Sequence, residues 1–240
     1  MLKLNLQLFG GRGAGADSGS GADGPIPGGG GGRGNGMQGP PQRFQIPEEN
    51  LKAGLGEKGK AASINEAIQR VNPLYGYESG NQSNYIENCQ RCVVAYELQR
   101  RGYDVMALPT YEGDRLPSGM KWRGAFRHAK TKTISRSTRG AALKDMEKEL
   151  LSYGNGARAI IGVRSGSGGH VFNAEVVGGK IRYVDAQTNT IYDPKRVLNH
   201  VDPRNVRVTR TDNLRISERA KKSVTKRVNG KTHPNATNRG

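Results

Sequence analysis

The stretch that most restricts the fold runs from His170 to Gln187 and reads HVFNAEVVGGKIRYVDAQ. Two runs rich in β-branched and aromatic residues flank Gly178 and Gly179. A Gly-Gly pair between two such runs is typical of a tight β-hairpin. The strands of a hairpin are antiparallel neighbours, so we expect an antiparallel sheet built around this segment.

Other segments add strands and helices around the hairpin. Residues 157–165 have the composition of a buried strand, and residues 103–109, 190–194 and 206–210 predict further strands. Residues 63–72 predict a short helix, because Ser63 is a good N-cap and Glu66 stands at the spacing of a capping box. Helical spacing of apolar residues also appears over residues 89–101 and 139–153. Helices followed by a mostly antiparallel sheet define the α+β class.

The two ends of the chain differ from its middle. Residues 1–40 contain 15 of the 35 glycines and too few apolar residues to offset the backbone entropy of folding. We therefore expect a disordered Gly-rich arm over residues 1–46, a linker with the short helix over 47–75, the folded domain over 76–210 and a basic, disordered tail over 211–240.

Charge indicates one class of partner. The formal net charge is +17, and residues 121–140 hold seven Lys and Arg and no acid. Such a basic excess attracts nucleic acid or another polyanion, although a solvated basic surface is an equal alternative. Aromatic residues are sparse in these segments, so a stacking platform for bases is not expected. No run of residues is apolar enough to span a bilayer, and we expect no membrane partner and no secretory signal.

Both cysteines of the chain, Cys89 and Cys92, lie at the start of the apolar helix. The unpaired N–H groups and the dipole of a helix N-terminus stabilise a thiolate. A cysteine nucleophile also needs a base and a group that orients the base. His170 begins the first hairpin strand and Asp185 ends the second, so the hairpin brings them to the same end of neighbouring strands.

Other interpretations of these residues are weaker. A structural zinc site needs four ligands, and the second pair is missing, so no metal or other cofactor is expected. A redox Cys-x-x-Cys pair usually follows a strand, whereas a polar loop precedes this one. Cys92 could be an inert buried thiol or an alternative nucleophile. Of the remaining histidines, His128 lies in a basic patch, His233 lies in the tail, and His200 has no rigid element to hold it.

Four segments together resemble a known family. They are NCQRCVVAYELQRRGYDVMALP, MKWRGAF, GARAIIGV and GHVFNAEVVGGKIRYVDAQT, which fall between residues 72 and 210. They resemble the papain-fold toxin domain, or glutamine deamidase toxin domain, found in polymorphic bacterial toxins and in phage and prophage minor head proteins. The resemblance implies a papain-like fold, in which a helix bearing the cysteine packs on a mostly antiparallel sheet that bears the histidine and the aspartate.

The resemblance also implies roles for individual residues. Cys89 matches the nucleophile, His170 the base and Asp185 the group that orients it. Cys92 stays open as the alternative nucleophile, because in papain-type Cys-x-x-Cys the second thiol reacts. The weaker supporting candidates, which could serve the oxyanion hole or the strand end, are Gln82, Asn84, Asn88 and Gln187.

The function implied is hydrolysis of a protein amide through a thioester, either glutamine deamidation or peptide cleavage, with a protein as substrate. The residues LNLQLFGGRG near the N-terminus resemble the starts of phage structural proteins of Gram-positive bacteria. A non-catalytic virion component, whose basic segments contact nucleic acid or capsid, is therefore the alternative. The expected location is the bacterial cytoplasm or a phage virion, with delivery into a target cell as a further option.

Overall fold

The computed structural model describes most of the chain between residues 54 and 227. The described ranges are 54–75, 83–110, 121–165, 168–193, 195, 198–199 and 201–227. The α-helices are α2 (Ile64–Val71), α3 (Ser83–Ile86), α4 (Cys89–Gln99) and α5 (Arg139–Ser152), and the 3-10 helices are η1 (Lys121–Ala125) and η2 (Glu218–Lys222). The strands are β1 (Val105–Ala107), β2 (Lys132–Ile134), β3 (Arg158–Ser165), β4 (Gly168–Val177), β5 (Lys180–Asp185), β6 (Thr190–Tyr192), β7 (Val206–Arg210) and β8 (Val224–Lys226).

Six of these strands form one sheet in the order β2-β7-β3-β4-β5-β6, and every neighbouring pair is antiparallel. The predicted hairpin is confirmed: Val177 pairs with Lys180 across the Gly178–Gly179 turn. Both glycines have positive φ, 57° and 73°, as a two-residue hairpin turn of the primed type requires. A separate small sheet pairs β1 with β8.

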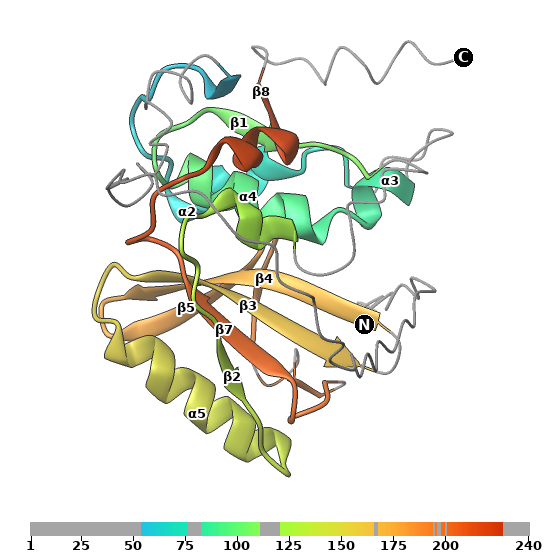
Figure 1. Ribbon diagram of the computed structural model, residues 1–240, viewed down its shortest axis with the longest axis vertical. Coiled ribbons are helices and arrows are strands. Elements are labelled where there is room, and N and C mark those ends of the chain that lie inside the picture. The colour runs from blue at the N-terminus through green and yellow to red at the C-terminus, as the bar shows by residue number, and fades with distance from the viewer. Residues whose placement is uncertain are drawn as a thin grey trace, which may run out of the picture.

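The sheet lies between two helical layers, with α2 and α4 on one face and α5 on the other (Figure 1). Strand alternation divides the core accordingly. On β3, Ile160 joins the cluster that includes α4, whereas Ile161 joins the cluster that includes α5. The α+β class expected from the sequence is therefore confirmed.

Most of helix α4 is enclosed in the core. Its residues from Arg91 to Gln99 are all buried, and among them Glu97 is completely inaccessible to solvent. The Glu97 carboxylate accepts hydrogen bonds from Arg101 Nε at 2.7 Å and from Arg158 Nε and Nη2 at 2.9 and 3.0 Å. Buried charge is tolerated where it is paired in this way, and the pair with Arg158 fixes α4 to β3.

The short helix expected over residues 63–72 is also confirmed. Ser63 Oγ accepts from the N–H of Glu66, and the Glu66 carboxylate accepts from the N–H of Ser63, which completes the capping box. Its buried face contacts α4. Residues expected only to link the arm to the domain thus contribute to the core, where Leu55 is 1 % exposed.

The fold also extends past Arg210, where the sequence predicted a disordered tail. Residues 224–226 form β8, and the side chains of Ala220 and Val224 are buried in the core. The basic composition suggested solvent on all sides, but cationic side chains can point outward while the small and β-branched residues between them pack inward. Residues 228–240 and the expected Gly-rich arm lie outside the described residues.

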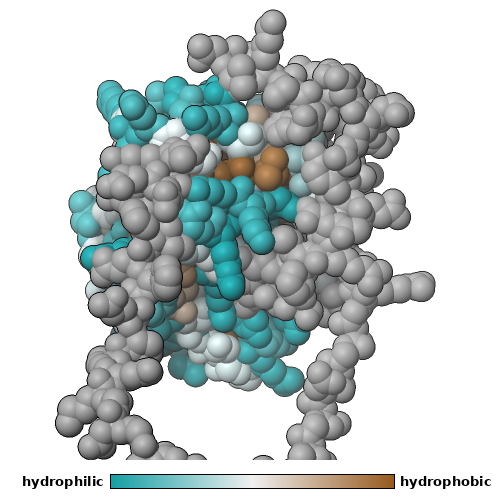
Figure 2. Space-filling view, turned by 45° about the horizontal axis from the view of Figure 1, so that its top comes forward, coloured by the Kyte–Doolittle hydropathy of each residue, from teal (hydrophilic) through white to brown (hydrophobic). Residues whose placement is uncertain are grey.

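The face seen in Figure 2 is mostly hydrophilic where it is described, with a small hydrophobic patch. None of the helices in the described part of the chain has the length and hydrophobicity that a membrane span needs.

Candidate active site

Cys89 is the first residue of α4, and Asn88 occupies the N-cap position before it. Asn88 does not cap the helix with its side chain. Its Nδ2 donates instead to Asn72 Oδ1 and to the carbonyl of Leu108, each at 3.2 Å. The residue that usually covers the N–H groups of the first turn is thus directed elsewhere.

His170 and Asp185 lie on neighbouring strands, as predicted. The register pairs Asn173 with Val184, so the next step places Asp185 opposite Phe172 and makes His170 its diagonal neighbour on the same face. His170 Nε2 lies 2.8 Å from Asp185 Oδ2. Because this contact uses Nε2, Nδ1 is the ring nitrogen left for Cys89.

The Asp185 carboxylate is 1 % exposed and accepts three hydrogen bonds. The Gln187 N–H donates to Oδ1 at 3.0 Å, and Oδ2 accepts from both His170 and the Tyr192 hydroxyl. Burial alone raises the pKa of Asp185, but the charge of His170 and these donors outweigh burial and hold the pKa below its usual range. The carboxylate is therefore ionised and fixed in place.

The pKa of His170 shifts the other way. Burial lowers it, but the Asp185 carboxylate and a hydrogen bond with Cys89 overcome this effect, so the pKa of His170 lies well above its usual value. The His170 side chain is 22 % exposed. A protonated imidazole is thus held between a carboxylate and a thiol, and solvent can still reach it.

The two cysteines differ in their surroundings. Cys89 is partly exposed, whereas Cys92 is 1 % exposed and donates its S–H to Asn88 Oδ1 at 3.1 Å. Burial, with a smaller effect from Cys89 and Asp185, raises the pKa of Cys92 well above that of a free thiol. Such a thiol is a poor nucleophile near neutral pH.

The residues expected to support the site, Gln82, Asn84, Asn88 and Gln187, differ in what their side chains contact. Gln187 uses its backbone N–H for Asp185 and its side-chain amide for the Ile86 carbonyl. Both donors of the Asn88 amide are occupied, so that side chain has no donor left for an oxyanion. Gln82 lies outside the described residues, as does the side chain of Asn84.

Two residues of the site were not expected from the sequence. Asn72 Nδ2 donates to the carbonyls of Tyr85 and Gln187, at 3.0 and 2.8 Å, and so ties the segment after α2 to the strand end. No pattern near Asn72 indicates these contacts. Tyr192 could have been found, because the predicted strand over 190–194 places an aromatic hydroxyl near the end of the Asp185 strand.

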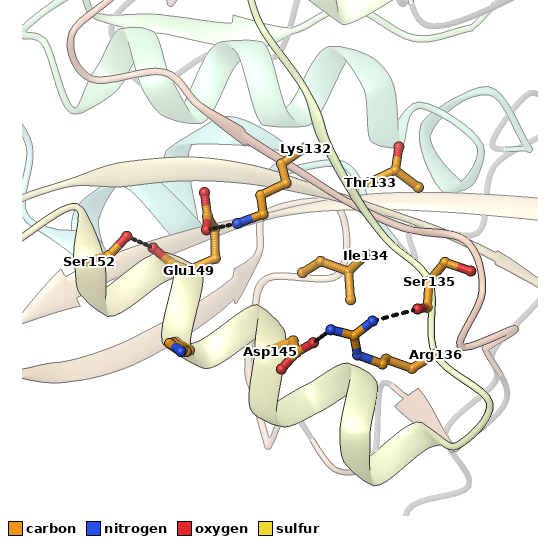
Figure 3. A pocket seen from close by; sticks show the side chains of 9 residues that line it. Lys132, Thr133, Ile134, Ser135, Arg136, Asp145, Glu149 and Ser152 are labelled. Carbon is orange, nitrogen blue, oxygen red and sulfur yellow. Dashed lines mark hydrogen bonds and ion pairs between the residues drawn. The ribbon is translucent and has the colours of Figure 1, made fainter.

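A pocket of about 290 Å³ lies away from this site, between β2 and α5 (Figure 3). Most of its charged side chains pair with one another, Lys132 with Glu149 and Arg136 with Asp145. Neither cysteine lines it, and neither does His170. Among the described residues no group of His, Cys, Asp and Glu side chains is suited to hold a metal ion.

Comparison with known families agrees with this geometry. Residues 87–190 match the family model described as papain fold toxin 1, glutamine deamidase. Over this range the chain is similar to the papain-fold toxin domain. The matched segment includes the helix of Cys89 and the hairpin of His170 and Asp185, and the sheet continues beyond it through β7. Neither a curated protein nor a solved structure gives a significant match to the chain.

Proposed function

We propose that this chain is a cysteine hydrolase that deamidates a glutamine side chain of a protein, with Cys89 as nucleophile, His170 as acid and base, and Asp185 as the orienting carboxylate. The observation that carries the proposal is the 2.8 Å contact of His170 Nε2 with a buried carboxylate. The same imidazole also interacts with the thiol of Cys89, at a helix N-terminus. The family of the domain supports the choice of glutamine as substrate.

In the first half of the reaction, His170 holds the proton of Cys89, so the sulfur attacks as a thiolate. The Cys89 Sγ bonds to the carbonyl carbon of the amide, and the carbonyl oxygen becomes an oxyanion. The donors proposed for this oxyanion are N–H groups at the start of α4, which the Asn88 side chain does not cover. His170 then gives its proton to the nitrogen, ammonia leaves and a thioester remains.

In the second half, water attacks the thioester. His170, now neutral, takes a proton from the water, and Asp185 stabilises the imidazolium that forms. The C–S bond breaks, glutamate is released and the thiolate–imidazolium pair is restored. The proton that left with ammonia is thereby replaced from water, and no further reactant is needed.

The test is incubation of the full chain with a library of soluble bacterial and eukaryotic proteins, followed by peptide mass spectrometry. Deamidation converts an amide to an acid without cutting the chain, so we expect glutamine-to-glutamate mass shifts and no new termini. A Cys89→Ala variant should produce no glutamine-to-glutamate mass shifts and no new termini. New chain ends that depend on Cys89 would identify a protease, and equal modification by Cys89→Ala would contradict the proposal.

A further inference from the structure

We propose that Tyr192 is a positioning residue, whose hydroxyl orients Asp185 and moderates the hold of this carboxylate on His170. The inference rests on the proposed function, in which His170 is the acid and base. It assigns a role to a residue of β6 that would act on His170 through Asp185.

The first support is the hydrogen bond itself. The Tyr192 hydroxyl donates to Asp185 Oδ2, the same oxygen that faces His170 Nε2. A donor on this oxygen draws negative charge away from the imidazole and helps to keep the pKa of Asp185 low. Burial, together with the charge of Asp185 and this contact, raises the pKa of Tyr192, so its hydroxyl keeps its proton and donates it to the carboxylate.

The second support is the packing that fixes the tyrosine ring. Phe172 stacks on the His170 ring, with ring centroids 6.1 Å apart and an interplanar angle of 26°. The Tyr192 ring meets Phe172 edge to face, at 6.1 Å and 88°. The side chains of His170, Phe172, Tyr192 and Asp185 therefore form a closed ring of contacts across β4, β5 and β6.

The chain provides a matched control. Tyr183 lies directly opposite Tyr192 in the β5–β6 register, and its ring also meets Phe172 edge to face, at 6.3 Å and 62°. The Tyr183 hydroxyl, however, is buried and has no hydrogen-bond partner among the described residues. Tyr192→Phe and Tyr183→Phe each remove one phenol hydroxyl. Of these two hydroxyls, that of Tyr192 donates to the Asp185 carboxylate.

The other titratable groups that face the pair stay unchanged in this comparison. They are Cys89 and Cys92 of α4, and Tyr75 from the segment after α2. Without the Tyr192 hydroxyl, Asp185 would concentrate its charge on His170 and bind the imidazolium more strongly. The sign expected for Tyr192→Phe is therefore an increase in the pKa of His170.

The experiment compares Tyr192→Phe, Tyr183→Phe and wild type as full chains. Histidine is labelled with ¹⁵N, His170 is assigned with a His170→Gln variant, and its imidazole signal is titrated with pH. We expect the pKa of His170 to rise by about 0.5 to 1 unit in Tyr192→Phe, the size of one net hydrogen bond. The Tyr183→Phe variant should titrate as wild type does. An unchanged or lowered pKa of His170 in Tyr192→Phe would overturn the positioning role.

Alkylation separates this inference from the proposed function. The pH profile of Cys89 alkylation by iodoacetamide depends on His170 if the two form an ion pair, so its upper inflection should move upward in Tyr192→Phe. If His170→Ala leaves the profile unchanged, the ion pair of the proposed function is refuted, whatever Tyr192 does. If His170→Ala alters the profile and Tyr192→Phe does not, the role of Tyr192 alone is refuted.

Discussion

The two cysteines occupy the same helix one turn apart, yet their environments give them different chemistry. Cys89 begins the helix and is partly exposed, whereas Cys92 is enclosed and hydrogen-bonded to Asn88. The thiolate is the reactive form, and burial disfavours it.

We therefore expect iodoacetamide to alkylate Cys89 well before Cys92 near neutral pH in the folded protein. Tryptic mass mapping at short reaction times measures both rates in one sample. Unfolding in guanidinium should remove the difference, which serves as the control. Faster labelling of Cys92 in the folded state would make Cys92 the nucleophile instead.

The pair of His170 and Asp185 gives a second prediction for single residues. Because the pKa of folded His170 is raised, the stabilisation from its protonated form is fully present below the unfolded-state pKa of about 6.5 and is lost as pH rises through the folded value. Asp185 has a lowered pKa, so its contribution is lost only as pH falls through that value.

The difference in unfolding free energy between wild type and His170→Ala should accordingly be largest at mildly acidic pH and shrink in alkaline solution. Urea denaturation across the pH range measures it. Asp185→Asn should remove the same pH-dependent part, so adding it to His170→Ala should cost little more. A difference that grows with pH would contradict the ion pair.

At the scale of elements, the hairpin and the capping box were predictable because both depend on neighbours in sequence. The two adjacent glycines Gly178 and Gly179 indicate the turn, and Ser63 and Glu66 of the capping box are only three residues apart. The contact of Asn72 with Gln187 joins residues 115 apart, and no local pattern carries such information. The pairing of His170 with Asp185 was predictable because a hairpin brings residues 15 apart in sequence to neighbouring positions.

The turn also provides a prediction about stability. An alanine at Gly179 would meet no atom within 4 Å, so its cost comes only from the positive φ of 73°. Gly179→Ala should therefore destabilise by about 1 kcal/mol. Gly140, in the first turn of α5, also has open space around it. Gly140→Ala should stabilise slightly, by about 0.5 kcal/mol. Chemical denaturation measures both, and the same sign for the two variants would show that φ does not decide the outcome.

For the whole molecule, the extent of the fold was the feature hardest to predict. A net charge of +17 predicted that the basic C-terminal region is solvated or binds nucleic acid. Part of this region instead completes the core. Arg91 Nη1 donates to the Lys222 carbonyl at 2.6 Å, so the helix of Cys89 is held by residues near the end of the described chain.

Truncation tests this boundary. A chain that ends at Arg210 loses β8 and the buried Ala220 and Val224, so it should unfold at a much lower temperature or without cooperativity. A chain that ends at Arg227 should keep the wild-type melting temperature, as should one that begins at Phe44, because both keep every described element. Calorimetry measures all three, and an unchanged transition for the chain that ends at Arg210 would show that β8 is dispensable.

The pairing of β1 with β8 has a consequence for biosynthesis. A ribosome releases the helix of Cys89 long before it releases residues 224–226, which close the small sheet over that helix. Contacts between such distant parts of a chain form slowly and late. The arrangement therefore delays completion of the core that supports the thiol until nearly all of the described chain has left the exit tunnel.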